Sequence, residues 1–494
     1  MPRFIEGEPR TQSTLFPERI EDYIDADNPV RAIEAFVGAL DLEQLGFQGM
    51  SPKTTGRPAY HPSTMLKLYI YGYLNRIQTT RRLERESGRN IELMWLLGRL
   101  RPDFKTISNF RRSNGKAIRK VCAEFVGLCR KLDLFSQALV AIDGSKFKAS
   151  NNRDKNFTPA KLKRRMEEIE KSIARYFSRL DRVDDEEPDA ASQAGKLEDK
   201  IASLKEEVKR LKALEPEVLS APDKQLSMID PDARSMRSRG TGMVGYNVQT
   251  AVDAEHHLIV THEVTKQNND RDFLTAMAIK ARTEMGVEEL EVVADRGYYK
   301  SQEIKASEEA GLRVLIPKPR TSGNRARGLY DRSDFRYNPS EDAYHCPAGE
   351  TLNWRMTTQE KGQNLHRYWS SNCRACKLKS KCTTGKERRV TRWEHEEVLE
   401  RVEHRLARDP DKMRTRCQTV EHPFGTIKHW MGATHFQMTT LKHVSTEMSL
   451  HVLAYNMKRV MNILGVTSLI EAIRALLQTI MCLLRPTYAV REGY

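Results

Sequence analysis

One short apolar run, Ala138 to Ile142, ends abruptly at an acid, Asp143. Small and branched apolar residues in succession predict a strand that is buried on both faces of a sheet. Gly144 follows the acid, so we expect the chain to leave the sheet at this point. Asp-Gly is also a common turn, in which the carboxylate caps its own backbone. Asp143 is therefore either a turn residue or a functional acid at a strand end, and other acids must decide between the two.

A second apolar run ends in the same way, because Leu290 to Ala294 is followed by Asp295 and a nearby glycine. Between the two runs the sequence predicts a β-hairpin from Tyr246 to Val264 and a helix from Asp272 to Met285. Another helix and strand follow, and this order predicts an α/β fold with a mixed sheet. If the two acid-ending strands are neighbours, Asp143 and Asp295 lie side by side and repel each other unless a cation lies between them.

Glu421 is the candidate for a third acid, on a stretch that is predicted to be helical. Gly425 would leave room beside its carboxylate and Lys428 could reach a phosphate, because these positions share one helix face. Pro423 predicts that the regular helix begins near this point. A group of acids between Glu396 and Glu403 is the alternative, but none has a small residue and a Lys on its face.

Three acids at one sheet edge indicate a hard divalent cation, since Mg²⁺ prefers carboxylate, phosphate and water oxygens. In a two-metal site one ion activates water or a 3′-hydroxyl and the other stabilises the leaving oxygen. The residues by themselves therefore predict metal-dependent phosphodiester chemistry with two Mg²⁺ ions, held by Asp143, Asp295 and Glu421.

The charge balance favours a nucleic acid as the partner. Lys and Arg number 82 against 67 Asp and Glu, which gives a formal net charge of +15, although a merely soluble basic protein has the same balance. Residues 1–135 are predicted to be helical, with one long helix from Thr106 to Leu134. Cations beside hydroxyl and amide side chains suit phosphate contacts of the helix-turn-helix kind, and a solvated helix face has the same composition. The candidate DNA-binding residues there are Arg81, Arg82, Arg111 and Arg112.

Two insertions interrupt the predicted core. Residues 157–220 carry apolar residues at alternating spacings of three and four, in two series separated by an acidic loop with Pro188, which predicts an antiparallel helical hairpin. Residues 321–400 are basic and contain four of the 8 cysteines.

Met1 to Glu8 contain acids where an export signal needs an apolar core, so we expect a cytoplasmic, nucleoid-associated protein with reduced or metal-bound cysteines.

The cysteine cluster has two interpretations. A two-residue gap lets a pair of thiolates meet one ion, and two further ligands would close a tetrahedral structural zinc site. The alternative is a set of reduced surface thiols, and His345 and His366 are possible substitute ligands. The zinc candidates are Cys346, Cys373, Cys376 and Cys382.

Together these pieces resemble the DDE transposases of bacterial insertion sequences, which share an RNase H-like core. The resemblance extends over nearly the whole chain and is carried by four segments: Ala141 to Ser145, Gly245 to Asp253, Asp295 to Tyr299, and Val420 to Lys428. It implies a mixed five-stranded sheet flanked by helices, with Asp143, Asp295 and Glu421 as catalytic acids and Lys428 as a phosphate ligand. Relatives have a Tyr and an Arg before the Glu. Here Cys417 stands in place of the Arg and the Tyr is missing, so Arg416 or Arg414 is expected to substitute for the Arg.

The resemblance also implies the domain order and the activity. Residues 1–135 would be a helical DNA-binding domain, and 136–156, 221–320 and 401–494 the catalytic core, interrupted by a helical hairpin (157–220) and a cysteine-containing, zinc-binding insertion (321–400). The protein would bind double-stranded DNA at transposon ends and target, as a homodimer or higher oligomer, and would cut strands and transfer them. An RNase H-like nuclease without strand transfer and a non-catalytic DNA-binding derivative are the alternatives.

Overall fold

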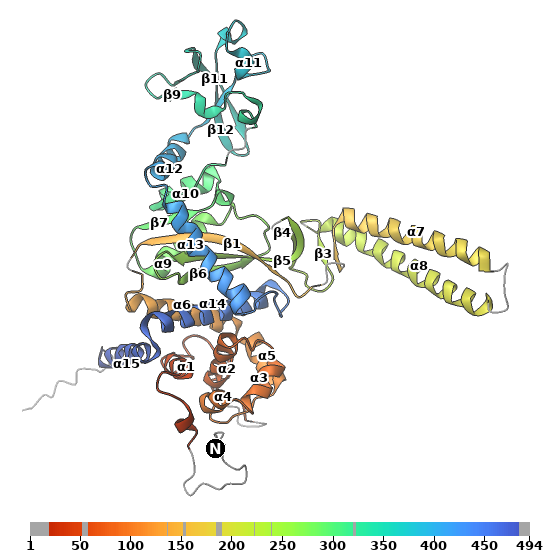
Figure 1. Ribbon diagram of the computed structural model, residues 1–494, viewed down its shortest axis with the longest axis vertical. Helices are drawn as coiled ribbons and strands as arrows, with labels where there is room; N and C mark the ends of the chain where they lie inside the picture. Colours follow the sequence, from red (N-terminus) through yellow and green to blue (C-terminus); the bar gives the residue numbers. More distant parts are fainter. Residues whose placement is uncertain are drawn as a thin grey trace, which may run out of the picture.

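The computed structural model describes residues 19–51, 58–135, 137–151, 155–183, 190–221, 223–238, 240–319 and 323–483. Figure 1 shows three layers along the long axis of the molecule: helices of the N-terminal part, a central sheet, and a small second sheet at the far end. A long helical hairpin projects sideways from the central sheet (Figure 1). The expected α/β organisation with a mixed sheet is therefore present.

The N-terminal layer consists of short helices whose starts are fixed by side-chain caps. Asn28, Thr79, Asn90 and Asp103 each accept a hydrogen bond from a backbone N–H in the first turn of the helix that follows. These caps satisfy donors that a helix start leaves without partners. The helices are α1 (Pro29–Gly38), α2 (Pro62–Leu74), α3 (Thr80–Ser87), α4 (Ile91–Leu96), α5 (Phe104–Ser113) and α6 (Gly115–Lys131), preceded by a 3₁₀ turn, η1 (Ile20–Tyr23).

The single long helix predicted from Thr106 to Leu134 is wrong, because the chain breaks at Asn114 between α5 and α6. The Asn114 side chain accepts a hydrogen bond from the backbone N–H of Gln48 at 2.7 Å. The residue between the two helices is therefore bound to a loop that is distant in sequence. A Cβ on Gly115 would lie 2.5 Å from the Thr446 hydroxyl oxygen, so a larger residue would not fit there. The break therefore lets α6 pack closely against the C-terminal helix that carries Thr446.

The central sheet has six strands instead of the five implied by the resemblance. Its order is β4-β5-β1-β7-β8, and β6 pairs with β5 alongside β4. β1 is antiparallel to β5 and parallel to β7, and β7 is parallel to β8. The strand that the sequence did not predict is β4, which forms a tight hairpin with the start of β5. The bounds are β1 (Leu139–Lys148), β4 (Arg234–Ser238), β5 (Thr241–Asp253), β6 (Ile259–Thr265), β7 (Leu290–Ala294) and β8 (Leu312–Leu315).

Strand β1 continues through Asp143, which corrects the expectation that the chain leaves the sheet at Gly144. Its parallel pairing with β7 stops at Ile142 opposite Ala294, but its antiparallel pairing with β5 continues to Lys148 opposite Gly245. The long partner strand β5 supplies backbone hydrogen bonds beyond the acid. Asp143 thus lies where the pairing with β7 has ended and the pairing with β5 continues.

Helices cover both faces of this sheet and join it to the N-terminal layer. The buried helix α14 packs against α2, α6 and β6, so one continuous apolar core spans the two layers. Among the described residues no single helix is long and apolar enough to cross a bilayer; α14 and α15 would reach that length and composition only as a pair, which bends by 104°. The covering elements are α9 (Leu274–Met285), η3 (Arg296–Tyr298), α10 (Ser301–Glu309), α12 (Glu396–Arg408), α13 (Lys412–Gly425), the π-helical turn η7 (Thr426–Trp430), α14 (Leu441–Leu464) and α15 (Val466–Leu483).

The two insertions form separate substructures. Helices α7 (Pro159–Val183) and α8 (Ala190–Ser220) lie side by side along an apolar seam that includes Leu162, Ile169 and Leu211. The predicted acidic loop with Pro188 lies outside the described residues. A short two-stranded antiparallel sheet, β2 (Asn156–Phe157) with β3 (Leu226–Ser227), joins the two ends of the hairpin at its base.

The cysteine-containing insertion folds into a second, antiparallel sheet, which its basic composition did not predict. The strand order is β13-β12-β11-β10-β9, over a small core of Phe335, Tyr344, Leu352, Tyr368 and Val390. The elements are η4 (Arg325–Arg327), η5 (Arg332–Asp334), β9 (Arg336–Asn338), β10 (Ala343–His345), β11 (Thr351–Glu360), β12 (Gln363–Trp369), η6 (Ser371–Arg374), α11 (Lys379–Cys382) and β13 (Val390–Trp393).

Candidate active site

Asp143 and Asp295 meet at the end of the parallel pairing between β1 and β7. The last paired residues are Ile142 and Ala294, so the two acids occupy the next position on each strand. The strands hold their backbones side by side, as the apolar runs predicted. Two carboxylates at this spacing repel each other, and this repulsion is visible in the electrostatics of the site.

Asp143 is held mostly out of water, with its side chain 25% exposed. Burial raises the pKa of Asp143 to about 6; the Arg416 guanidinium opposes this shift, and the carboxylates of Asp295 and Asp270 add to it. Arg416 lies with Nη2 3.0 Å from the carboxylate, in the position of a counter-ion. Arg416 Nε is buried and has no hydrogen-bond partner among the described residues. The site therefore carries excess negative charge that one arginine only partly offsets.

Asp295 begins the 3₁₀ turn η3 and is oriented by that turn. Its carboxylate accepts a hydrogen bond from the backbone N–H of Gly297 at 2.7 Å. A Cβ at Gly297 would lie 2.8 Å from the same carboxylate oxygen, so the glycine that follows the second apolar run is needed for this close approach. The acid is thus fixed by its own turn, while Asp143 is fixed by the strand.

Glu421 lies on α13, the helix that contacts β1 and β7. Its neighbour Val420 is buried against Ala141 and Val293, which lie two residues before the two aspartates in the sequence. The Glu421 side chain is exposed, and the described residues contain no group of three or more His, Cys, Asp or Glu side chains arranged to hold a metal ion. The structure therefore brings Asp143 and Asp295 together and places Glu421 on the adjacent helix, outside their cluster.

The helix around Glu421 does not begin near Pro423, as the sequence suggested, but starts at Lys412 and continues through Gly425. Pro423 has no N–H to offer the carbonyl of Thr419, one turn earlier. The helix nevertheless continues past Pro423 to Gly425.

Three of the four competing acids of α12 are engaged elsewhere. Glu396 pairs with Lys318 and Arg332, Glu400 with Arg392, and Glu403 with Lys318. These ion pairs connect α12 to β13 and to residues 318–332. The pairs give these acids a structural role and leave Glu421 as the acid next to the sheet edge.

Lys428 reaches β1 beyond Asp143. Its ammonium group donates to the Ser145 hydroxyl at 2.6 Å and to the Lys146 carbonyl at 3.0 Å, and it lies 4.4 Å from the centre of the Phe147 ring. It comes from the π-helical turn η7, directly after α13. A cation is therefore held two residues along the strand from Asp143.

Four polar residues next to the acids were missed by the sequence analysis: Asn247, Gln249, Asp270 and Tyr298. Gln249 and Tyr298 are fully buried, and Asn247 is nearly so. The available signal was the unusual pair of amides inside the buried strand β5, where polar side chains need partners. Their partner Asp270 lies in a loop that has no sequence pattern of its own.

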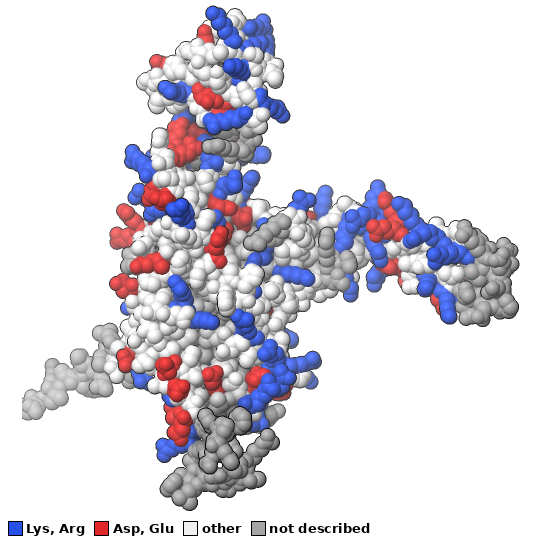
Figure 2. Space-filling view, viewed as in Figure 1, with Lys and Arg blue, Asp and Glu red and all other residues white. Residues whose placement is uncertain are grey.

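The predicted DNA-binding arginines divide into exposed and buried ones. Arg81, Arg82, Arg112 and Arg414 are exposed, and Figure 2 shows Lys and Arg side chains gathered where α3 and α5 reach the surface. Arg111 is only 6% exposed and donates to the Tyr73 hydroxyl at 2.9 Å, beside the ring of Tyr69. Arg111 therefore cannot contact DNA in this structure, because the helix turns it into the core.

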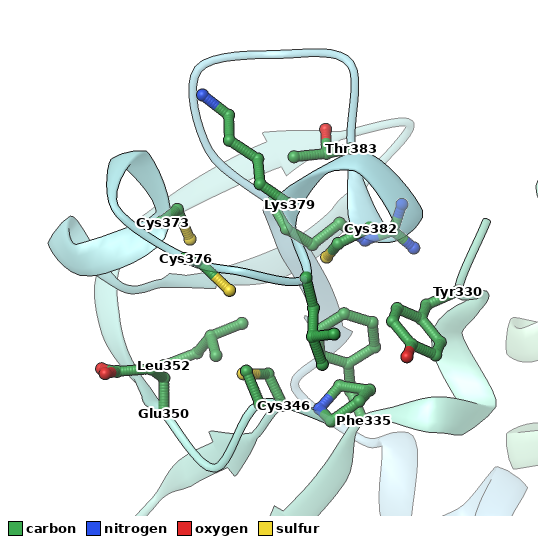
Figure 3. A pocket seen from close by; sticks show the side chains of 14 residues that line it. Tyr330, Phe335, Cys346, Glu350, Leu352, Cys373, Cys376, Lys379, Cys382 and Thr383 are labelled. Carbon is green, nitrogen blue, oxygen red and sulfur yellow. The ribbon is translucent and has the colours of Figure 1, made fainter.

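The four clustered cysteines surround one small cavity of about 30 Å³ in the second sheet (Figure 3). Burial raises the pKa of the Cys382 thiol, Arg388 opposes the shift, and Cys373, Cys346 and Cys376 add to it. The four sulfurs are thus close enough to affect one another, although their present spacing is not that of a metal site. His345 pairs with Glu341 and His366 with Thr357, and neither lines the cavity.

Comparison with known proteins gives two family matches. Residues 18–113 match the family model described as a transposase domain (DUF772), and residues 345–461 match the model described as a transposase DDE domain. No curated protein matches the sequence. Among solved structures, the chain is similar to a cryo-EM structure of the piggyBac transposase synaptic complex with hairpin DNA, at 10% identity, over 94% of this chain and 84% of that one. The TM-score of 0.30 is too low to support an argument from that fold.

Proposed function

We propose that this chain is an insertion-sequence transposase of the DDE type, a DNA-acting polynucleotidyl transferase, as its two transposase-domain matches indicate, and that Asp143 and Asp295 are its catalytic metal-binding pair, with Glu421 as the third acid. The observation that carries the proposal is the register of β1 and β7, which sets the two aspartates side by side. Divalent-metal dependence follows from the DDE type. The number of ions and their identity as two Mg²⁺ are part of the proposal.

The donor set fits a hard divalent cation. Both aspartates offer carboxylate oxygens, the ligands that Mg²⁺ prefers. Asp143 has a raised pKa because it is buried among like charges, so a cation there would favour its ionised form. Arg416 already lies at the carboxylate as a positive group. When bound, Mg²⁺ would activate the attacking hydroxyl or water and stabilise the leaving oxygen.

The cations around the acids would position the DNA backbone. Lys428 is held next to β1, two residues beyond Asp143. Arg416 keeps a buried Nε without a partner among the described residues, which a phosphate oxygen would satisfy. Arg414 is exposed on the same helix. These residues would orient the scissile phosphate against the acids while the helical layer holds the flanking duplex.

We assign the recognition of transposon ends to the helical residues up to 135, with Arg81, Arg82 and Arg112 as phosphate contacts. They are exposed on or beside the short helices α3 and α5, where cations gather (Figure 2). Arg111 is withdrawn from this set because it is buried. Cutting and joining at two ends requires two active sites, so we propose a homodimer or higher oligomer on DNA.

The test is incubation of the protein with DNA that carries the element's ends, with Mg²⁺ or with EDTA. Wild type is expected to cleave and then join the 3′ ends to target DNA only with Mg²⁺, and Asp295→Ala is expected to do neither. Asp409→Ala, an exposed acid at the end of α12, is the matched control and should behave as wild type. Cleavage that survives EDTA or Asp295→Ala would contradict the site.

The same assay separates the alternative functions. Metal-dependent cleavage without joined products would indicate an RNase H-like nuclease. Binding to the ends without cleavage would indicate a non-catalytic DNA-binding derivative. Glu421→Gln tests the third acid, and unchanged cleavage by this variant would remove Glu421 from the catalytic set.

We also propose a structural zinc ion bound by Cys346, Cys373, Cys376 and Cys382. All four thiols face one cavity under the second sheet, and this sheet has only a small apolar core to stabilise it (Figure 3). Zinc would draw the four thiolates together into a tetrahedron. Elemental analysis should find about one zinc per chain by this ligand count, lost in Cys376→Ser and retained in Cys417→Ser, an exposed cysteine outside the cluster. Metal-free wild-type protein with a fully folded second sheet would contradict the proposal.

A further inference from the structure

A third aspartate, Asp270, lies beside the catalytic pair in the loop between β6 and α9. One of its oxygens, Oδ1, accepts hydrogen bonds from the side-chain amides of Asn247 and Gln249, both at 2.7 Å. Both amides belong to β5, the strand that pairs with β1 around Asp143. Asp270 therefore ties a loop to the strand next to the catalytic acid.

The connection continues from Gln249 to the turn that carries Asp295. The Tyr298 hydroxyl donates to Oε1 of Gln249, while Nε2 of the same side chain donates to Asp270. Tyr298 is the last residue of η3, which Asp295 caps. Gln249 and Tyr298 are both fully buried. A chain of hydrogen bonds thus runs from the Asp295 turn, through β5, to Asp270.

This chain lies directly against Gly144, the residue after Asp143. A Cβ at Gly144 would lie 2.4 Å from Nε2 of Gln249 and 2.5 Å from Oδ1 of Asp270. Only a residue without a side chain leaves room for the two groups there. Gly144 is therefore required for this contact, and the contact fixes the backbone next to Asp143.

We infer that Asp270 is a positioning residue for strand cleavage, which holds Asn247 and Gln249 so that Gln249 anchors Tyr298 and fixes the Asp295 turn beside Asp143. The physical need is clear, because two carboxylates that repel each other keep a productive spacing only if the surrounding structure holds them. A displacement of about 1 Å at a reacting centre can cost about 10²-fold in rate. The inference rests on the proposed catalytic role of Asp143 and Asp295.

The geometry distinguishes positioning from a role of the Asp270 charge. Both amide hydrogen bonds converge on one oxygen, Oδ1, and an asparagine side chain keeps such an oxygen. We call the hydrogen bonds that join Asp270, Asn247, Gln249 and Tyr298 the clamp. Asp270→Asn therefore preserves the clamp and removes the charge, whereas Asp270→Ala removes both. If Asp270 acted as a metal ligand or as a charge, the two variants would be impaired alike.

The experiment measures single-turnover cleavage of end-containing DNA at saturating protein and Mg²⁺. Asp270→Ala is expected to cleave about 10²-fold more slowly, by displacement of the acids, and Asp270→Asn to cleave close to the wild-type rate. Tyr298→Phe should be slowed in the same direction, and the double variant with Asp270→Ala should be no slower than Asp270→Ala alone. Asp272→Ala is the control from the same loop, because Asp272 pairs with Lys300 at the surface, at 2.5 Å.

Two results would overturn the inference: Asp270→Asn as slow as Asp270→Ala, or losses from Asp270→Ala and Tyr298→Phe that multiply. A double-mutant cycle on the unfolding midpoint of the same variants tests the clamp without catalysis, since coupled residues give shifts that do not add. If wild type binds DNA but does not cleave it, the proposed function fails while this cycle still reports on the clamp. Additive midpoint shifts would show that Asp270 and Tyr298 are not connected.

Discussion

Asp143 in the sheet and Glu447 in α14 are both held largely out of water near an arginine, and they differ in what surrounds them. Glu447 is fully buried and accepts three hydrogen bonds from the backbone N–H groups of Gln437 and Met438, at 2.9 to 3.1 Å. Asp143 is partly open to solvent and has Asp295 and Asp270 as neighbours. Glu447 is surrounded by donors, whereas Asp143 has two like charges beside its own donors, which are the Gly144 N–H at 2.9 Å and Arg416.

In both cases burial raises the pKa of the carboxyl group and an arginine opposes the shift. For Glu447, the backbone donors oppose it as well, so the polar groups around it stabilise the buried charge. For Asp143 the other carboxylates make the charge less favourable. A buried acid whose partners are donors indicates a structural role, whereas one crowded by other acids at an open edge indicates a site for a cation.

Asp143→Asn gives the largest expected effect and tests the catalytic side of this comparison. We expect cleavage of end-containing DNA to fall by about 10³-fold or more, since an essential electrostatic group is lost. The free energy of unfolding should stay equal or rise, because a repelling charge is removed. Cleavage assays and chemical denaturation measure the two quantities. A loss of stability together with activity would mean that Asp143 is a structural acid like Glu447.

Glu447→Ala tests the structural side. Removal of the carboxylate takes away a charge that acts on the buried Arg111, and leaves the backbone donors of Gln437 and Met438 without an acceptor. Leaving a buried donor unsatisfied costs about 1–3 kcal/mol for each group, which denaturant unfolding should detect. Glu447→Gln, which keeps an acceptor oxygen, should lose less. Equal losses in the two variants would show that the backbone hydrogen bonds contribute little.

In the same buried region, His451 is expected to lower the free energy of unfolding at acid pH. Burial, together with the smaller effect of the Arg111 charge, lowers the pKa of His451 to about 3. The unfolded chain binds a proton near pH 6.5, and the folded chain does not until about pH 3. Stability from this residue is therefore complete above pH 6.5 and falls as pH drops, by about 1.4 kcal/mol per pH unit.

His451→Phe should flatten that pH dependence, because the ring that cannot accept a proton in the folded state is gone. Urea unfolding between pH 7 and pH 5 measures the difference, and subtraction of the variant from wild type removes the contributions of the other titrating groups. His435→Phe, an exposed histidine, is the control. An unchanged slope in His451→Phe would contradict the assignment.

The smallest expected effect comes from the adjacent arginines of α5. Arg112→Ala should weaken DNA binding several-fold and reduce the salt dependence of the affinity by about 0.9 per lost phosphate contact, with stability unchanged. Arg111→Met should instead destabilise the fold, because the Tyr73 hydroxyl loses its donor and buried Glu447 loses an opposing charge. Binding isotherms at several salt concentrations and thermal unfolding compare the two. A salt slope that changes in Arg111→Met but not in Arg112→Ala would reverse the assignment.

The sequence by itself determined the two strands that carry Asp143 and Asp295, the α/β class, the helical N-terminal part and the hairpin helices. These features depend on local patterns, since runs of apolar residues and their spacing reflect short-range sterics and burial. The tertiary structure decided that β1 continues past Asp143, because only the position of β5 supplies the partner strand. It also decided that Arg111 is buried while Arg112 is exposed, although the two are neighbours of the same type.

The clamp around Asp270 shows the same limit most clearly. Asn247, Gln249, Asp270 and Tyr298 are spread over about fifty residues of chain, and none has a neighbour in sequence that reveals its partner. Their contacts exist because three strands and a loop close on one another. Local sequence can predict which segments are strands and helices, but the partners of buried polar side chains are set by how distant segments pack.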